Sequence, residues 1–517
     1  MKVEGFVAEI AKQNDENDSS DKRKKRLKRQ KRRDDFQRFE AISSDNKTDS
    51  LTDRLTDYRR YADVSHTQFL VGNRHGDLFC LPFPIKNIGF IPNLRCGFKF
   101  GYTFSLRFRM IFPMRTIQRT SSETILRASD QFPVVLLTGA RQVGKTTLLK
   151  SISEQKRIYV SLDDPRIRDI ARNDPELFLQ TYPPPVLIDE FQYAPALLPF
   201  IKMAVDAHPD LCGQFWLTGS QRFLMMRDVG ESLAGRVAVF EIGGITQGEE
   251  FRDGSSGALL DGSLPCATAE YGDVHSLFNR IHRGMFPALA SGRVRDRSLF
   301  YASYLQTYLE RDVRDLSKVG DESAFLAFLK AAAARTAQLV NLSELARDVG
   351  ISVPTAKAWL SILEASGVVY LLHPYSRNVT SRIVKTPKLH FLDTGLCCHL
   401  AGWNTVESAE TGAMNGALLE SYVVSEILRS HWNVGRTPEL WFYRDKIGAE
   451  VDLLIGHDGV LDPMEIKKKA SPTEDDVKAF GKLQSLGLPL GKGGILCLAR
   501  SFRPLNRSVS IIPIGAL

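Results

Sequence analysis

Eight consecutive residues, GARQVGKT from Gly139 to Thr146, have the types and spacing needed to bind phosphate groups. They match the pattern G-x-x-x-x-G-K-[ST] and stand between a short apolar strand-like segment and a helical one. Glycines let the backbone curl so that successive N–H groups point inward, and the start of a helix favours an anion. We expect the phosphates of a nucleotide to be bound by Gly139, Ala140, Arg141, Gln142, Val143, Gly144, Lys145, Thr146 and Thr147.

The Lys and Thr of this loop define which nucleotide chemistry is expected. Lys145 would reach the β- and γ-phosphates of ATP, and the Thr146 hydroxyl would bind Mg²⁺. A chance match in a glycine-containing turn is the alternative, and the strand-before, helix-after setting argues against it. The expected cofactors are therefore ATP and Mg²⁺.

A second acidic motif lies about 45 residues after the loop. The apolar run VLIDE ends in Asp189 and Glu190, which is the form of a Walker B strand. Asp189 would bind Mg²⁺, directly or through water, and Glu190 would act as general base on the attacking water. Because a glutamate has no obvious purpose in simple binding, the pair favours ATP hydrolysis.

Two further candidates follow the next strand-like segments. In WLTGS, Ser220 or Thr218 could contact the γ-phosphate or the attacking water, whereas Ser220 could equally cap the next helix. In ESLAGRV, Arg236 could neutralise transition-state charge as an arginine finger, whereas a surface salt bridge is the competing interpretation. We assign Glu190, Ser220 and Arg236 as candidate catalytic residues.

Near the C-terminus, EVDLLIGHDGVLDPMEIKKK reads as a hairpin whose two-residue turn is Asp458-Gly459. In such a hairpin the numbers of two residues that face each other across the strands sum to 917, so Asp452 faces Glu465. Lys467 lies on the same face of the hairpin as Glu465. Opposed carboxylates repel unless a cation lies between them, and Mg²⁺ prefers such oxygen ligands. Pro463 leaves a one-residue slip open, which would move the two acids to opposite faces.

The elements that must position these residues alternate between strand and helix from residue 134 to 219. Four apolar strand-like runs, VVLLTG, RIYVSLDD, PPVLIDE and QFWLTGS, are separated by helical segments, with Asp163, Asp164 and Pro165 opening one helix. This pattern predicts an α/β fold with a parallel sheet covered on both faces. Residues 245–273 are rich in Gly and Ser and predict a loop or linker.

The following segment is predicted to be mainly helical over residues 296–364, and residues 368–517 to be mixed. An apolar stripe with Leu342 and Leu345, a break at Gly350, a cap at Ser352 and a strand at 368–372 indicate a helix-turn-helix with a wing. Its second helix exposes few basic residues, so DNA reading and protein packing both remain open.

Composition limits the partners and compartment. The chain has 517 residues and a net charge of +8, but residues 1–113 hold 23 Lys and Arg against 15 Asp and Glu, and the rest hold 45 of each. Seven scattered cysteines without zinc spacing favour a reducing cytoplasm. No apolar run is long enough to span a bilayer and no secretory signal is evident, so we expect no membrane association.

The leader, residues 1–113, contains ten basic residues within positions 22–33. Such a block is usually disordered, and a nucleic-acid or lipid contact is the alternative. Met114 would make a natural start for a compact protein.

Together, FPVVLLTGARQVGKTTLL, PPVLIDEFQYAPALLPFIK, SLAGRV, FLDTGLCCHL and GALLESYVVSEI resemble the prokaryotic AAA-type ATP-binding proteins with a C-terminal domain of unknown function. The resemblance covers about residues 114–480. It implies ATP binding and hydrolysis, an ASCE-type sheet, a winged helix and a PD-(D/E)XK nuclease-like fold. In that fold Asp452, Glu465 and Lys467 supply the D…ExK set, and Glu420 matches an acidic helix residue sometimes added to it.

These observations predict a domain order. The leader spans 1–113, the P-loop ATPase domain 114–245, a linker and helical region 246–325, the winged helix 326–378 and the nuclease-like domain 379–517. Three functions remain open: an ATP-driven switch or motor on DNA, an ATP-regulated metal-dependent nuclease, or a nucleotide-dependent protein-interaction switch. Assembly into a homo-oligomer would let Arg236 reach a neighbouring subunit.

Overall fold

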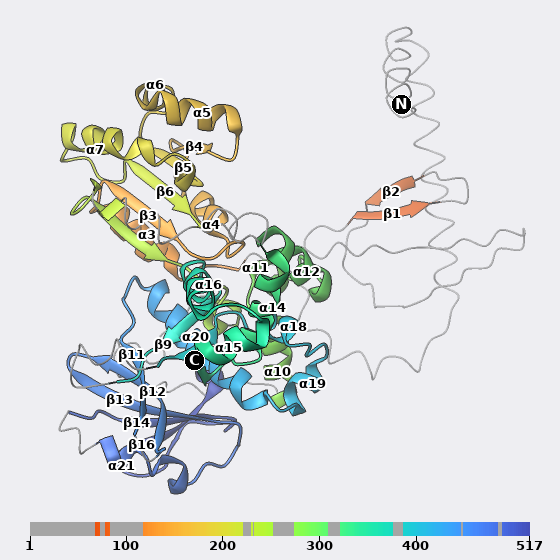
Figure 1. Cartoon of the computed structure of the whole chain (residues 1–517). Coiled ribbons are helices and arrows are strands. Elements are labelled where there is room, and N and C mark those ends of the chain that lie inside the picture. Colours follow the sequence, from red (N-terminus) through yellow and green to blue (C-terminus); the bar gives the residue numbers. More distant parts are fainter. Residues whose placement is uncertain are drawn as a thin grey trace, which may run out of the picture. The chain divides into compact units, whose positions relative to one another are not determined.

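Figure 1 shows the computed structural model of the chain. It describes residues 68–72, 78–82, 117–220, 229–230, 232–251, 273–308, 321–375, 386–445, 448–483 and 489–517. The chain divides into two units, Met1–Pro113 and Met114–Leu517. Within the first, the described residues form an antiparallel pair, β1 (Gln68–Gly72) and β2 (Leu78–Pro82). The basic block at 22–33 and its predicted disorder lie outside the described residues.

The second unit begins with a five-stranded, all-parallel sheet, as the strand and helix alternation predicts. Its strands in chain order are β3 (Val134–Thr138), β4 (Ile158–Ser161), β5 (Val186–Asp189), β6 (Phe215–Gly219) and β7 (Val237–Glu241). In space the order is β4-β5-β6-β3-β7. The strand before the P-loop therefore lies between β6 and β7, and the strand that ends in Asp189 is one strand further away.

Alternating residues of these strands enter two separate cores, so both sheet faces are covered. Val135 and Leu137 pack with α3 (Ser121–Ser129) and α4 (Lys145–Ile152). Val134 and Leu136 pack on the other face. That face is covered by α5 (Pro165–Asn173), α6 (Pro175–Thr181) and α7 (Leu198–Ala207), preceded by the short 3-10 turns η3 (Phe191–Tyr193) and η4 (Pro195–Leu197). Asp164 caps α5 by accepting from Arg166 N at 2.9 Å, which confirms the predicted helix start.

The start of the predicted linker is instead a buried helix. Helix α9 (Gln247–Phe251) has Gln247, Glu249 and Glu250 nearly inaccessible to solvent. The loop prediction fails for these residues because partners distant in sequence satisfy their polar groups. Helices α10 (Val274–Arg283), α11 (Pro287–Ala290) and α12 (Arg297–Tyr308) follow residues 252–272, which lie outside the described part of the chain.

The helical region ends in a small three-stranded antiparallel sheet. Its helices are α14 (Glu322–Ala333), α15 (Leu342–Val349) and α16 (Val353–Ala365), and its strands β8 (Gln338–Leu339), β9 (Val369–Leu372) and β10 (Lys388–Phe391). Gly350, at φ 77°, ends α15, and Ser352 caps α16 through Thr355 N at 3.2 Å. The spatial order is β8-β10-β9, so a domain boundary at residue 379 would divide one sheet.

The C-terminal segment places three helices beside a six-stranded mixed sheet. The helices are α18 (Thr394–Leu400), α19 (Val406–Thr411) and α20 (Asn415–Asn433). The sheet has the order β11-β12-β13-β14-β16-β15, formed by β11 (Leu440–Arg444), β12 (Glu450–His457), β13 (Val460–Lys467), β14 (Gly493–Cys497), β15 (Arg503–Pro504) and β16 (Val509–Pro513). The 3-10 turns η6 (Glu474–Val477) and η8 (Ile514–Ala516) and helix α21 (Phe480–Leu483) complete the segment.

The hairpin register is confirmed. Asp458 and Gly459 have φ of 47° and 78°, and Leu453 pairs with Met464, a sum of 917. Pro463 causes no slip because β14 pairs with β13 only from Met464 onward. The missing N–H of the proline therefore falls where β13 has no ladder partner in β14.

One hydrophobic core connects the two halves of this unit. A single cluster of contacting side chains runs from Val135 in β3 through Tyr422 in α20 to Ile512 in β16. Among the described residues no helix is both long and apolar enough to cross a membrane.

Candidate functional site

The P-loop follows β3 in the conformation that its glycines predict. Gly139 has φ 143°, and a Cβ there would lie 2.1 Å from the carbonyl oxygen of Ile242, so only glycine fits. Gln142 and Gly144 also have positive φ, which curls the chain before α4 begins at Lys145. This local geometry points the start of α4 at the space where phosphates would bind.

Lys145 is buried and folded into its own loop. Its Nζ donates to the carbonyl oxygens of Gly139 at 2.9 Å and Ala140 at 2.8 Å. Backbone carbonyls hold the ammonium group at the centre of the curl. Phosphate oxygens are stronger partners for a cation than neutral carbonyls, so a bound nucleotide would take over these contacts.

The two predicted Mg²⁺ ligands are in direct contact. Thr146 Oγ1 donates to Asp189 Oδ1 at 2.8 Å, and Tyr159 Oη donates to Asp189 Oδ2 at 3.0 Å. Thr218 also donates to Asp189 Oδ1. A hydroxyl in the first turn of α4 and a carboxylate at the end of β5 are the oxygen ligands that suit Mg²⁺.

Glu190 lies next to this pair in a left-handed conformation, at φ 55°. Burial raises the pKa of its carboxyl group, and the positive charge of Lys145 opposes the rise. Gln192 donates to Glu190 Oε2, and the backbone N–H of Glu190 donates to Thr218 Oγ1 at 3.3 Å. A carboxylate with a raised pKa close to the phosphate site has the properties of a general base.

Of the two sensor candidates, Thr218 lies closer to the acidic pair. It contacts both Asp189 and the backbone of Glu190. Ser220 accepts from Gln192 Nε2 at 3.4 Å and so reaches Glu190 only through that side chain.

Arg236 lies away from the site of its own chain. Its carbonyl accepts from Val134 N, so it stands at the start of β3 and β7, whereas the P-loop follows the end of β3. Its Nε is 2.5 Å from Asp206 Oδ1 in a half-exposed salt bridge. The structure therefore gives Arg236 the salt-bridge role, and a finger role would require a neighbouring subunit.

Arg119 holds the back of the P-loop, a contact that the sequence does not reveal. Its guanidinium donates to Val143 O, to Gly243 O and to Glu249 Oε1, each at 3.0 Å. Glu249 in turn accepts from Asn433 Nδ2 at 3.2 Å, at the end of α20. The P-loop backbone is thus connected through buried polar contacts to the C-terminal segment.

The C-terminal hairpin brings three of its predicted site residues together. Lys467 Nζ lies 2.5 Å from Glu465 Oε1 and 3.6 Å from Asp452 Oδ2. Burial, together with the nearby charge of Asp452, raises the pKa of Glu465 to about 8. Its Oε2 is buried without a hydrogen-bond partner.

Glu420 on α20 is near this group but is held by a lysine not anticipated from the sequence. Lys388 on β10 donates to Glu420 Oε1 at 2.9 Å and also contacts Glu450. Burial raises the pKa of Glu420 to about 7, Lys388 opposes the rise and Asp452 adds to it. In the part of the chain that is described, no three His, Cys, Asp or Glu side chains are grouped closely enough to hold a metal ion.

Three segments of the chain match known protein families. Residues 131–251 match a family described as an AAA domain. Residues 274–407 and 415–517 match two domains of unknown function, DUF8612 and DUF4143. Uncharacterized proteins of Mycobacterium bovis and Mycobacterium tuberculosis are each 29% identical over 397 residues, which covers 77% of this chain and 83% of theirs.

Two solved structures are similar at low identity. A Walker-type ATPase of Pyrococcus abyssi is 16% identical with a TM-score of 0.35, covering 56% of this chain and 99% of its own. A RuvB variant of Thermotoga maritima is 18% identical with a TM-score of 0.25, covering 48% of this chain and 85% of its own. The AAA match places an ATP-binding domain of the AAA type over the P-loop, Asp189 and Glu190.

Proposed function

We propose that the chain binds and hydrolyses ATP and uses this cycle to change the state of its C-terminal half. The observation that carries the proposal is the contact of Thr146 with Asp189 beside Lys145 and Glu190. Thr146 and Asp189 would hold Mg²⁺, which supplies charge stabilisation to the phosphates. Lys145 orients the phosphates, and Glu190 accepts the proton of the attacking water.

The first test is ATP turnover by the full chain. Lys145→Ala is expected to abolish it, and Glu190→Gln to lower it by about 10²- to 10⁴-fold while ATP still binds. Lys202→Ala, an exposed lysine on α7, is the matched control and should leave turnover unchanged. Full turnover by Lys145→Ala would rule out this site as the ATPase.

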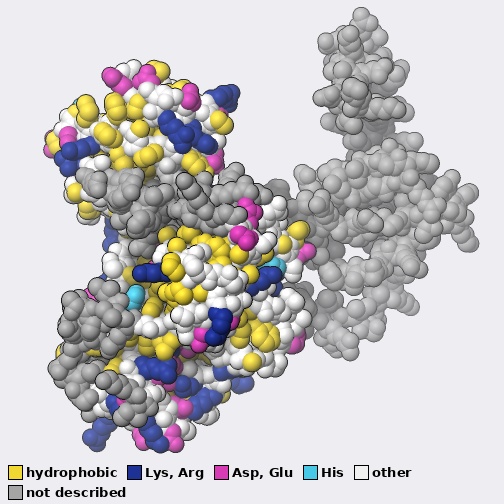
Figure 2. Space-filling model, in the orientation of Figure 1, with side chains coloured by type: hydrophobic (Ala, Val, Ile, Leu, Met, Phe, Trp, Pro, Cys, Tyr) yellow, Lys and Arg dark blue, Asp and Glu magenta, His cyan; other side chains and the backbone are white. Residues whose placement is uncertain are grey.

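We propose DNA as the partner on which the cycle acts, through α15, α16 and the small sheet. The order helix, strand, helix, helix, strand, strand fits a winged helix, in which the second helix of the pair enters the major groove. The distribution of charged side chains gives the DNA proposal no additional support. Figure 2 shows Lys and Arg side chains interspersed with Asp and Glu over the described part of this face.

ATP turnover with and without DNA at low salt tests the partner class, because phosphate contacts are strongest there. Stimulation by DNA, lost in Lys357→Glu on the exposed side of α16, supports the proposal. Absence of both binding and stimulation favours a protein-interaction switch. A comparison of the full chain with one that starts at Met114 would isolate any effect of the leader.

A metal-dependent nuclease is the second candidate, favoured by Asp452 and Glu465 on facing strands with Lys467 beside them. The two acids would bind Mg²⁺ and the lysine would position water. DNA cleavage in Mg²⁺ or Mn²⁺ that Glu465→Ala abolishes would support it. Cleavage that persists in this variant would point to a contaminant.

Assembly is a further part of the proposal. In a homo-oligomer Arg236 could reach the phosphates of a neighbouring subunit. Turnover per chain that rises with protein concentration, and does so less in Arg236→Ala, would support this role.

A further inference from the structure

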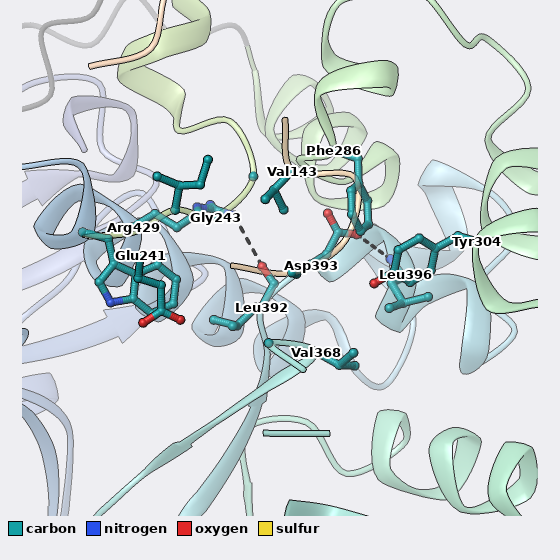
Figure 3. A pocket seen from close by; sticks show the side chains of 15 residues that line it. Val143, Glu241, Gly243, Phe286, Tyr304, Val368, Leu392, Asp393, Leu396 and Arg429 are labelled. Carbon is teal, nitrogen blue, oxygen red and sulfur yellow. Dashed lines mark hydrogen bonds between the residues drawn. The ribbon is translucent and has the colours of Figure 1, made fainter. Parts of the chain in front are cut away.

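The side of the P-loop that faces the segment after β7 is closed by protein. A small pocket lies there, lined by Val143 of the P-loop, Gly243 after β7 and Arg429 of α20 (Figure 3). Its volume of about 30 Å³ has room for water and not for a nucleotide. Gly367, in the turn between α16 and β9, also lies against the loop, since a Cβ built on it would be 3.4 Å from Ala140 Cβ. A ligand of the P-loop would therefore lie on the other side, towards β5 and the edge strand β4.

Tyr159 of β4 approaches Asp189 from that edge. In the parallel ladder Tyr159 pairs with Leu187 of β5, two residues before Asp189. Its neighbour Val160 packs in the core on the α5, α6 and α7 face of the sheet, so Tyr159 lies on the opposite face, with Leu187 and α4. From this position the long phenol side chain reaches diagonally to the end of β5.

Helix α4 and Asp189 together hold the Tyr159 side chain. Its Oη donates to Asp189 Oδ2 at 3.0 Å, and Lys150 Nζ lies 3.3 Å from the centre of its ring. A cation over an aromatic face is attracted to it. Lys150 and Thr146 are four residues apart on α4 and lie on the same face of that helix. One helix therefore restrains both oxygens of Asp189, Oδ1 directly through Thr146 and Oδ2 through Tyr159.

The hydroxyl of Tyr159 matters more to Asp189 than the ring matters to the core. The residue is 41% exposed, so loss of the hydroxyl alone leaves the packed core unchanged. A carboxylate that acts on a metal ion has to be held in one orientation, and the groups that bond to it provide this. Without Tyr159 Oη, Asp189 Oδ2 would be free to turn towards water at the open edge of the sheet.

We propose that Tyr159 is a positioning residue of the nucleotide site, which fixes the carboxylate of Asp189 in the orientation from which Asp189 and Thr146 hold Mg²⁺. The proposal rests on the proposed function, because it needs a Mg²⁺-nucleotide at the P-loop. Tyr159 acts through Asp189. Its loss therefore weakens the contribution of the metal to nucleotide binding and leaves the metal-free contacts of the P-loop as they are.

The test measures the affinity of the full chain for AMP-PNP, an ATP analogue that is not hydrolysed, by calorimetry in Mg²⁺ and again in EDTA. The ratio of the two affinities isolates the contribution of the metal. Tyr159→Phe should lower this ratio by about ten-fold, with the affinity in EDTA and the thermal unfolding temperature unchanged. Tyr182→Phe, at the end of α6 on the other face of the sheet, is the matched control and should keep the wild-type ratio.

A double variant separates a positioning role from a structural one. Asp189→Ala should lower the ratio by itself, and Tyr159→Phe added to it should cause no further loss, because the carboxylate through which Tyr159 acts is gone. A wild-type ratio in Tyr159→Phe, or an equal further loss in the double variant, would overturn the role of Tyr159 and leave the P-loop assignment intact. A wild-type chain that binds AMP-PNP in neither condition would overturn the proposed function as well.

Discussion

At the scale of single residues, Asp189 accepts hydrogen bonds from three hydroxyl groups of the proposed nucleotide site. Thr146, Thr218 and Tyr159 all donate to its two oxygens. Thr218 also accepts from the N–H of Glu190. Thr218 therefore holds both Asp189, the proposed Mg²⁺ ligand, and Glu190, the proposed general base.

We predict that Thr218→Val lowers kcat by more than ten-fold with little change in the affinity for ATP, because the phosphates are held by the P-loop. Ser220→Ala, two residues further on, should have a smaller effect since Ser220 reaches Glu190 only through Gln192. Steady-state kinetics of both variants checks this. A larger loss in Ser220→Ala would show that Ser220 is the sensor.

The raised pKa of Glu465 predicts how stability depends on pH. In the folded chain this carboxyl keeps its proton up to about pH 8, against an ordinary value of 4.5. The folded state then binds more protons than the unfolded state in this window, so the free energy of unfolding falls as pH rises through it.

Glu465→Gln removes this titration, so its thermal stability should fall less than that of the wild type between pH 5 and 8. Thermal unfolding at a series of pH values measures the difference. Glu176→Gln on α6, an exposed glutamate, should follow the wild-type curve. Parallel curves for Glu465→Gln and the wild type would contradict the prediction.

Residues that act through local sequence could be predicted, and residues that act through distant contacts could not. The P-loop, Asp189 and Glu190 stand at strand ends whose apolar runs are visible in the sequence. In the sequence alone, nothing distinguishes Arg119 and Lys388 from ordinary surface residues. Only the fold brings Arg119 to Glu249, 130 residues away, and Lys388 to Glu420.

At the scale of elements, the hairpin could be predicted because local sequence determines it, whereas α9 could not because distant contacts determine it. A two-residue turn with positive φ fixes the register of β12 and β13 within a single stretch of chain. Helix α9 has a polar sequence that predicts an exposed loop. It is buried because Arg119, Arg280 and Arg283 neutralise Glu249 and Glu250.

Because Arg119 connects the P-loop to α9, its loss should affect both stability and nucleotide binding. Arg119→Ala leaves Glu249 as a buried charge, which costs about 3–5 kcal/mol of unfolding free energy. It also frees the Val143 carbonyl, so the KM for ATP should rise more than kcat falls. Urea unfolding and ATP kinetics test the two effects. Arg127→Ala, exposed on α3, should change the unfolding free energy by less than about 0.5 kcal/mol.

At the scale of the whole molecule, the AAA domain and the C-terminal segment share one core. Phe240 of β7 is buried and lies against Gly435, just beyond α20, where a Cβ would be 2.9 Å from its ring. Asn433, at the end of α20, donates a hydrogen bond to Glu249 in α9. The covering of this face of the parallel sheet therefore includes residues from both ends of the unit.

It follows that the AAA domain should not be an independently stable fragment. In a chain limited to residues 114–251, Phe240 and its neighbours would be exposed, and each large side chain uncovered costs about 1.5–3 kcal/mol. Residues 114–517 should unfold cooperatively in urea, whereas 114–251 should give a broad transition and lose near-ultraviolet circular dichroism. A fragment 114–251 that unfolds cooperatively and binds ATP through Lys145 would show instead that the shared core is not required, and that the AAA domain can work without α20.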